Sequence, residues 1–375
     1  MELNTARVPD CPPDRVSPGW KIELLDEGAS VSRLWVVDRD IRIGASVVRA
    51  GGISTVGTND DHRGKGLAGQ VMDAALALMA KEGYDVTLLH GIPDFYHRYG
   101  FAPCMPEYTL RIATVDAERA SGPLALRSLK EGDYPAIARL YNGENARRTG
   151  SALRESETWK GFPRSVGWFT KPAVRVAADS RDRVVGYVVY DDVVDRVRVA
   201  EAGGQGGEVM GSILRHLAQR AIDLRKEEIH LALPPDHPLA LYARKLGCKA
   251  EIEFPRNHGF MGRIIRLLPF IEALAERMGR DGEYPLPPGE AALSTELGAA
   301  VLGFGGGKGW VDGNAAGREG AVHLGQSALF QMAMGYRSAR DLLMAGDLTG
   351  PPEAVDLLCA WFPLRNATLY WPDRF

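Results

Sequence analysis

The stretch of residues 52–101 constrains the fold more than any other part of the chain. It opens with a β-branched run at residues 53–58, which predicts a strand. The basic turn RGKGLA follows at residues 63–68, and apolar residues then recur at helical spacing over residues 67–79. Residues 86–90 predict a second, buried strand. The predicted order is therefore strand, glycine-broken turn, helix and strand.

A helix that begins in such a turn offers a site for an anion. The first N–H groups of the helix have no partner within it, and the helix dipole adds partial positive charge there. Gly64 and Gly66 allow a phosphate to approach the backbone, while Arg63 and Lys65 add full charges. The alternative is a basic surface turn leading into an ordinary amphipathic helix. The aromatic run FYHRYGF at residues 95–101, which follows the second strand, favours the anion site.

These two motifs resemble those of the GCN5-related N-acetyltransferase (GNAT) superfamily. Arg63-x-x-Gly66-x-Ala68 matches the pyrophosphate loop of that family, and residues 95–101 resemble its second motif. The resemblance implies that the strand before the loop pairs with the pantetheine of acetyl-CoA and that the loop holds the pyrophosphate. It assigns to acetyl-CoA the residues Val56, Gly57, Thr58, Arg63, Gly64, Lys65, Gly66, Leu67 and Ala68. A dinucleotide site is the competing phosphate interpretation, but the stretch has no Gly-x-Gly-x-x-Gly.

The composition is that of a globular protein of 375 residues, with room for two or three domains. A formal charge of −3 gives no reason to expect nucleic-acid binding and is compatible with a cationic substrate. Cys11, Cys104, Cys248 and Cys359 show no metal-ligand or redox spacing, which predicts free thiols in a reducing compartment and no metal site. Residues 1–19 are polar and proline-rich, unlike a signal peptide, and no apolar run reaches the roughly 18 residues that span a bilayer. We therefore expect a cytoplasmic protein without a membrane partner.

An antiparallel sheet is predicted ahead of the helix. Its expected strands are residues 20–25, 31–37 and 41–48, with turns at 26–28 and 38–40. Here the chain departs from the GNAT pattern, in which a strand and two helices normally come first and help to shape the acceptor pocket. Only residues 1–19 precede the predicted sheet. The pocket must therefore be reduced, or filled by another part of the chain.

The order of elements repeats in the middle of the chain. The expected elements are strand 124–129, helix 131–148, strands 174–178 and 184–190, helix 209–224 and strand 229–233. Residues 241–248 then echo the aromatic run 95–101, which indicates an internal duplication. The second copy lacks the loop chemistry, because residues 203–208 have no Arg-x-x-Gly-x-Ala spacing and place Glu208 at the helix start. Ala243 stands where the first copy has Tyr96.

The last third of the chain has a different pattern. We expect a β-like run at 260–268, helices at 269–278, 327–334, 339–345 and 351–361, a linker at 281–289, and glycine-separated strands up to residue 324. The glycine-rich run 303–309 lacks P-loop spacing and predicts a turn between strands. Two GNAT-like copies followed by such a segment resemble the Eis (enhanced intracellular survival) branch of the family, whose third domain is similar to sterol carrier proteins. Residues 328–348 resemble the penultimate helices of that domain.

The resemblance therefore predicts an α/β (α+β) fold, with tandem GNAT-like mixed sheets, flanking helices and a sterol-carrier-like α+β domain. The implied domains are a GNAT domain at residues 1–108, a degenerate copy at 109–258 and the sterol-carrier-like domain at 259–375. A homo-oligomer is also implied, since Eis-like proteins assemble as hexamers.

Acetyl transfer requires a neutral amine, a stabilised oxyanion and a proton for the departing thiolate. The resemblance places a backbone N–H near Val56 at the thioester carbonyl and assigns Tyr96 as the general acid, since a phenol of pKa about 10 can protonate a thiolate of pKa about 8.5. Eis-like enzymes use the terminal carboxylate as base, which implies that role for Phe375, with His90 as a second candidate. The alternatives are a packing aromatic at Tyr96, a frayed tail at Phe375 and a satisfied buried histidine at His90.

The sequence thus predicts an N-acetyltransferase that moves an acetyl group from acetyl-CoA to a primary amine of a small, cationic acceptor, by direct transfer in a ternary complex and without a metal. The alternative is a binding protein that holds CoA or an apolar ligand on the same fold, because its short N-terminus leaves no competent acceptor site. The identity of the acceptor does not follow from the sequence.

Overall fold

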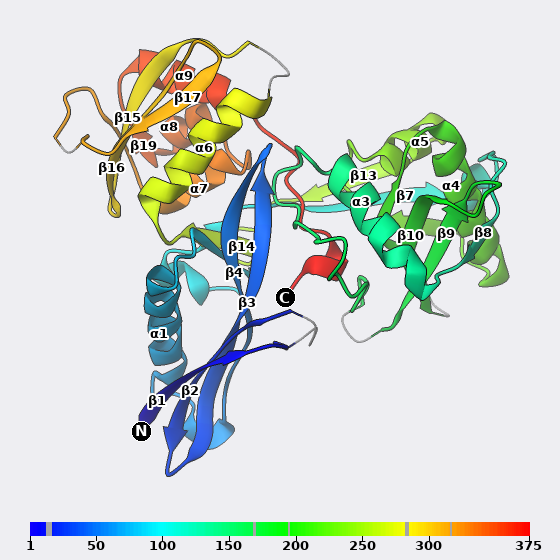
Figure 1. The fold of residues 1–375 in the computed structure, drawn as a ribbon, viewed down its shortest axis with the longest axis horizontal. Helices are drawn as coiled ribbons and strands as arrows, with labels where there is room; N and C mark the ends of the chain where they lie inside the picture. Colours follow the sequence, from blue (N-terminus) through cyan, green and yellow to red (C-terminus); the bar gives the residue numbers. More distant parts are fainter. Residues whose placement is uncertain (13–16, 168–169, 194–195, 282–284, 316) are drawn as a thin grey trace.

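The computed structural model of the protein describes residues 1–12, 17–167, 170–193, 196–281, 285–315 and 317–375. These residues form three mixed β-sheets with flanking helices. In Figure 1 the first sheet lies below, the second to the right and the third at the upper left. The predicted fold class is confirmed by this architecture.

The first sheet has the strand order β1-β2-β3-β4-β5-β14-β6. Its strands are β1 (Glu2–Val8), β2 (Gly19–Asp26), β3 (Ala29–Ile43), β4 (Ser46–Thr58), β5 (Val86–Gly91), β6 (Ala102–Pro103) and β14 (Gly259–Ile264). The predicted helix is α1 (Leu67–Lys81), and its buried side chains recur at helical spacing and include Leu67, Val71 and Met79. The strands before α1 are antiparallel, whereas β4 and β5 pair in parallel.

Two expectations for the first sheet were wrong. The sequence indicated no strand before residue 20, but β1 pairs with β2 along its whole length as an edge strand. Half of such a strand faces solvent, so its hydrophobic pattern is weak. The turn expected at residues 38–40 is a continuous part of β3, because these residues pair with residues 49–51 of β4. The charge of Asp38 is met by Arg7 and by the hydroxyl of Tyr84, and the chain turns instead after Ile43.

The second sheet has the order β13-β7-β12-β11-β10-β9-β8. Its strands are β7 (Glu107–Ala113), β8 (Leu126–Ser128), β9 (Pro172–Ala178), β10 (Val184–Val193), β11 (Arg196–Gly204), β12 (Glu228–Leu231) and β13 (Lys249–Glu253). Its helices are α2 (Thr114–Ala117), α3 (Tyr134–Glu144), α4 (Gly207–Asp223) and α5 (Pro238–Leu246). The sequence did not indicate β11, because Arg, Glu and Gly residues interrupt its apolar pattern. The predicted helix 131–148 ends four residues beyond the end of α3.

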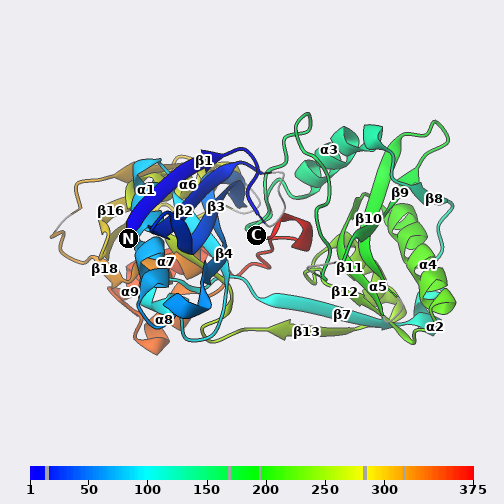
Figure 2. The ribbon, with the colours of Figure 1, turned by 90° about the horizontal axis from the view of Figure 1, so that it is seen from below.

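Each of the first two sheets contains one strand that follows the other sheet in the chain, β14 in the first and β7 in the second. In the first sheet, β4 and β5 are parallel and are followed by antiparallel β14 and β6; in the second, β11 and β12 are parallel and are followed by antiparallel β7 and β13. Although β7 directly follows the first sheet in the chain, it joins the second, and β14 directly follows the second but joins the first. Figure 2 shows β7 and β13 running from one part of the molecule to the other. The repeated order supports the predicted duplication and ties its two copies together.

The third sheet has the order β17-β16-β15-β18-β19. Its strands are β15 (Gly289–Thr295), β16 (Gly298–Gly305), β17 (Lys308–Asp312), β18 (Val322–Leu324) and β19 (Leu348–Thr349). The accompanying helices are α6 (Leu267–Asp281), α7 (Gln326–Ala333), α8 (Ala339–Ala345) and α9 (Pro352–Trp361). The run 303–309 contains the expected turn between β16 and β17, at Gly306 and Gly307, and its other residues belong to the two strands. Of the predicted linker 281–289, residues 282–284 lie outside the described residues, and the three domain limits stay predictions.

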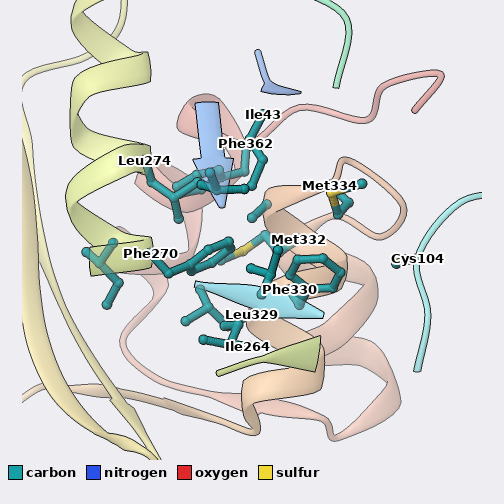
Figure 3. Close-up of a cluster of buried hydrophobic side chains, with 14 of the residues drawn as sticks. Ile43, Cys104, Ile264, Phe270, Leu274, Leu329, Phe330, Met332, Met334 and Phe362 are labelled. Carbon is teal, nitrogen blue, oxygen red and sulfur yellow. The ribbon is translucent and has the colours of Figure 1, made fainter. Parts of the chain in front are cut away.

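A shared apolar core joins the third part to the first sheet. Figure 3 shows side chains of α6 and α7 meeting residues from β3 and β14. Phe270 of α6 and Phe330 of α7 have ring centroids 5.8 Å apart, and Ile43 and Ile264 are fully buried in the same cluster. The third part is therefore packed on the first sheet through a buried apolar interface rather than tethered by a linker alone.

Candidate active site

The first sheet opens where β4 and β5 separate. Their parallel pairing ends at Gly52 and Leu88, although β4 continues to Thr58 and β5 to Gly91. We call the stretches of β4 and β5 beyond these two residues the fork. Backbone groups of β4 that point into the fork lack a strand partner, so an extended ligand could pair with them as an added strand would.

A bulge in β4 lies at the fork. Opposite β4, Trp35 of β3 pairs with Ser54 and Arg33 pairs with Gly57, so β4 has one more residue than β3 in this interval. Within it Thr55 has a φ of 46°, which is unusual for a β-branched residue. Such a bulge turns backbone groups out of the ladder, which makes them available to a ligand.

The predicted loop leads from the end of β4 into α1. Gly64 and Gly66 have φ values of 75° and 74°, and Gly66 is the residue from which α1 starts. No atom lies within 4 Å of the position that a Cβ would take on either glycine, so the loop faces open space. The first-turn N–H groups of α1 also have no partner inside the helix. The loop therefore has the room and the polarity to hold an anion.

A cavity of about 410 Å³ connects the loop with the fork. The predicted cofactor residues that line it are Val56, Gly57, Thr58, Arg63, Gly64, Gly66, Leu67 and Ala68, and Tyr96 lines it as well. Lys65 is exposed on the same loop but is not part of the lining. Much of the remaining wall comes from His62 and Ile92, which the sequence did not single out, and from Phe95, Arg98 and Tyr99 of the second motif, to which it gave no site role.

Tyr96 is held in a short 3₁₀ helix, η2 (Tyr96–Tyr99), by aromatic contacts. Its ring lies 4.9 Å from that of Phe95 and 6.2 Å from that of Phe101, both in edge-on geometry. Burial raises the pKa of the phenol above its usual value, followed by a smaller effect of Tyr99. The hydroxyl is therefore a neutral proton donor at physiological pH.

His90 and Phe375 form a second group, apart from the cavity. On β5, Leu89 belongs to the apolar cluster of α1 and Tyr96, whereas Leu88 belongs to the cluster of Phe375. Because alternate residues of a strand face opposite sides, His90 lies on the side of Phe375. The structure thus brings Tyr96 and the cofactor residues together on one side of the fork and places the other two predicted catalytic residues on the other.

The Phe375 ring covers the base of the fork. A Cβ on Gly52 would collide with this ring, so only glycine allows the close approach. Phe375 is 4% exposed, and Phe260 packs on it with ring centroids 6.1 Å apart. Nearby, both oxygens of Glu107 accept hydrogen bonds from Arg374 at 2.9 Å.

His90 completes this group. Its Nε2 lies 3.9 Å from Oε1 of Glu107. The side chain of His90 is 38% exposed. Partial burial of its ring, and then the charge of Arg374, lower the pKa of His90, although Glu107 opposes the shift. The imidazole is therefore neutral at physiological pH and able to accept a proton.

A buried ion network anchors the segment that carries Phe375, which we call the tail (residues 362–375). Arg154, 2% exposed, donates to both oxygens of Glu201 at 2.7 and 2.6 Å. It also donates to both oxygens of Asp373 at 3.2 and 2.8 Å, and the Tyr141 hydroxyl donates to Asp373 at 3.1 Å. Figure 1 shows the tail reaching from the third part to between the two other sheets. No local motif marks this network, because its members are dispersed along the chain.

The equivalent region of the second copy is built differently. β11 and β12 share only two parallel pairs, Arg198–His230 and Val199–Leu231, before β11 continues to Gly204. Just beyond the last pair stands Glu201, fully buried on Arg154. The N–H of Gly204, at the loop before α4, donates to the carboxylate of Glu144. α4 starts from Gly206, and Glu208 places a carboxylate in its first turn, where it would repel a phosphate.

The described residues include no cluster of three or more His, Cys, Asp or Glu side chains that could hold a metal ion. All four cysteines are free; Cys11 and Cys104 are buried, whereas Cys248 and Cys359 are half-buried. No helix in the described part of the chain combines the length and the apolar character that crossing a membrane would require.

Comparisons with known proteins identify the first part of the chain. Residues 11–104 match the model of an acetyltransferase (GNAT) domain, and this range contains the fork, the loop and Tyr96. A search of curated proteins found no match to the sequence. The chain therefore carries a GNAT domain, although this match covers about a quarter of its length.

Solved structures share the fold over nearly the whole chain. A GCN5-related N-acetyltransferase from Kribbella flavida has a TM-score of 0.74 at 18% identity, covering 95% of this chain and 87% of its own. A GCN5-related N-acetyltransferase from Anabaena variabilis has the same score and identity, covering 95% and 89%. Eis1 from Mycobacterium abscessus has a TM-score of 0.66 at 18% identity, covering 95% and 91%. At this identity the likeness concerns the fold alone.

The loop assignment predicts different effects for two substitutions of Gly66. Either new side chain would be strained at a φ of 74°, so Gly66→Ala measures the strain alone. Gly66→Glu adds a carboxylate at the start of α1, against the dipole and the bound phosphate. We expect calorimetry to show a modest loss of acetyl-CoA affinity for Gly66→Ala and no detectable binding for Gly66→Glu, with both variants folded by circular dichroism. Equal affinities would remove the loop from the cofactor site.

Proposed function

Because residues 11–104 match an acetyltransferase (GNAT) domain, we propose that the protein transfers an acetyl group from acetyl-CoA to a primary amine of a small, cationic acceptor. The observation that carries this proposal is the cavity at the fork, which gathers eight of the nine predicted cofactor residues and Tyr96. Transfer is direct, within a ternary complex, since the two predicted groups of catalytic residues lie on opposite sides of the fork. Acetyl-CoA enters from the side of the loop and the acceptor from the side of Phe375.

The cofactor residues would act through the backbone. Val56, Gly57 and Thr58 lie on the part of β4 that has no partner on the β5 side, where they would pair with pantetheine. The open loop at Gly64 and Gly66 would hold the pyrophosphate with first-turn N–H groups of α1, and Arg63 and Lys65 would add charge. Arg63 is already within 3.0 Å of Asp60 on the surface, so reaching the phosphate would exchange one exposed ion pair for another.

Proton transfer is assigned to residues on both sides of the fork. Tyr96 would donate a proton to the departing thiolate, because burial keeps its phenol neutral. His90, neutral for the reasons given above, would accept the proton of the acceptor amine directly or through a water. The α-carboxyl of Phe375 is the second candidate for this base, which the position of its ring at Gly52 supports. Glu107 and Arg374 would hold both candidates in place.

The organisation of the whole chain is proposed to be Eis-like. Support comes from the fold shared with Eis1 over 95% of the chain, and from three sheets in the predicted order. In this proposal residues 1–108 form the catalytic GNAT domain, 109–258 the degenerate copy and 259–375 a sterol-carrier-like domain, with β14 lent to the first sheet. Assembly as a homo-oligomer, in the manner of a hexamer, and a cytoplasmic location belong to the same proposal.

Substitution of Tyr96 tests the catalytic assignment. Tyr96→Phe keeps the aromatic packing but removes the hydroxyl, so we expect kcat to fall by about 10²–10⁴-fold while acetyl-CoA affinity stays unchanged. The assay is thiol release from acetyl-CoA with a panel of polyamines and aminoglycosides. Tyr99→Phe, in the wall of the same cavity, serves as the control and should keep nearly full turnover. No thiol release from the wild type with any amine, together with tight acetyl-CoA binding, would favour a binding protein instead.

Extension of the chain at Phe375 tests the proposed base. A tag would convert the α-carboxyl into a neutral amide, and loss of a positioned base typically lowers the rate by about 10²–10⁴-fold. Phe375→Leu keeps the carboxyl in place and should be milder. Acetyl-CoA affinity should barely change in either variant, because the loop is untouched. If the tagged enzyme turned over as fast as an N-terminally tagged one, the base would be His90 rather than Phe375.

A further inference from the structure

A second large cavity, of about 710 Å³, lies between the second sheet and the third part of the chain. Its walls come from the end of α3 and the loop after it, from α6 and α9, and from the first residues of the tail. None of its lining residues lines the cavity at the fork. The proposed acetyl transfer therefore leaves this cavity without a role.

The lining carries more positive than negative side chains. Arg147, Arg148, Arg277 and Arg365 line the cavity, against the carboxylates Glu144 and Asp236. Asp236 is already paired with Arg148, whose Nη1 lies 3.0 and 3.2 Å from its two oxygens. Burial raises the pKa of Glu144 to about 7, so this group is only partly charged at neutral pH. The cavity should therefore attract an anion.

Arg148 also has a donor without an acceptor. Its Nε is buried and finds no hydrogen-bond partner among the described residues, although Nη1 donates to Asp236 and, at 3.4 Å, to the carbonyl of Asn366. Buried guanidinium donors are normally satisfied, because an unmade hydrogen bond is costly. An oxygen of a bound anion would satisfy it.

Apolar side chains complete the lining. Leu286, Cys359 and Leu364 contribute to the walls, and Leu364 is 61% exposed although it stands beside the arginines. A single inorganic anion would neither fill the volume nor cover these side chains. An occupant with an apolar body would do both.

We propose that this cavity binds a small organic anion, consisting of a carboxylate or phosphate group on an apolar body. The charged group contacts Arg148 and its neighbouring arginines, and the apolar body covers Leu364 and Leu286.

Such an occupant would touch the anchored tail. Residues 363–366 form one wall of the cavity. From there the tail follows the second copy: the N–H of Thr368 donates to the carbonyl of Thr149 at 2.9 Å, and the hydroxyl of Tyr370 donates to Asn145 at 3.2 Å. A ligand that bridges Arg148 and Arg365 therefore adds a link between the second copy and the tail, and reduces the motion of residues 366–375.

Calorimetry with three simple probes tests the site on the full-length protein saturated with acetyl-CoA, which keeps the fork occupied. We expect one molecule of octanoate to bind per chain, at least about tenfold more tightly than inorganic phosphate or 1-octanol, because each of these lacks one of the two recognised groups. No octanoate binding would overturn the proposal, and so would equal affinity for 1-octanol. Equal affinity for phosphate would overturn the apolar part of the assignment.

Charges of opposite sign, introduced at an exposed wall residue, locate the site. Leu364→Glu should weaken octanoate binding by about tenfold or more, whereas Leu364→Lys should keep or strengthen it. Arg148→Gln should abolish binding, and Arg139→Gln, at an exposed position of α3, should not change it. If both Leu364 variants bound octanoate like the wild type, the site would lie elsewhere.

Hydrogen exchange tests the link to the tail without any assay of activity. We expect saturating octanoate to slow amide exchange in residues 366–375 of the wild type but not of Arg148→Gln. Unchanged exchange in the wild type would refute the link. Because none of these measurements depends on turnover, their outcome is independent of whether the protein is an acetyltransferase.

Discussion

The buried guanidinium of Arg154 holds together parts of the molecule that are far apart in the chain. It bridges Glu201 of β11 and Asp373 of the tail, and it stacks 3.7 Å from the ring centroid of Tyr141. Burying these charges is tolerable only while all partners are present, since removal of one member of a buried pair typically costs about 3–5 kcal/mol. The network therefore fixes Asp373 firmly, and two residues later Phe375 reaches the base of the fork.

Through Glu201 and Arg154 the second copy anchors the tail, a structural role that does not involve its own loop. In the first copy the fork leads to an open, basic loop and a cavity. In the second copy Glu208 lies in the first turn of α4, Glu144 accepts the N–H of Gly204, and Glu201 binds the guanidinium of Arg154. The second copy thus supports the site of the first by holding the tail. The exchange of β7 and β14 ties the two sheets together. β7 follows the first sheet in the chain but pairs with β12 of the second, and β14 follows the second sheet but pairs with β5 of the first.

The sequence predicts the features that depend on residues close together in the chain. The loop at residues 63–68, α1 and the strands around them are local, and short-range patterns specify them. The whole set of predicted cofactor residues except Lys65 lines one cavity for that reason. Edge strand β1 was missed because solvent faces half of it, and β11 because charged residues and glycines interrupt its apolar run.

Long-range features left no such pattern. Arg154 and Asp373 are 219 residues apart, and nothing near either of them indicates the other. The requirement for glycine at residue 52 comes from the ring of Phe375, which would collide with a Cβ there and is 323 residues away in the chain. Tyr96 was placed in the cavity as expected, whereas His90 and Phe375 proved to share the opposite face of the sheet, which depends on strand alternation and on the path of the tail.

The central claim is that only the first of two related copies retains a cofactor site. Its most direct test is the stoichiometry of acetyl-CoA binding, measured by isothermal titration of the full-length protein at known active concentration. We expect one molecule per chain, since the loop at residues 203–208 has no basic residue and places Glu208 in the first turn of α4. Two molecules per chain, or one molecule whose binding survives loss of the loop at residues 63–68, would contradict the assignment.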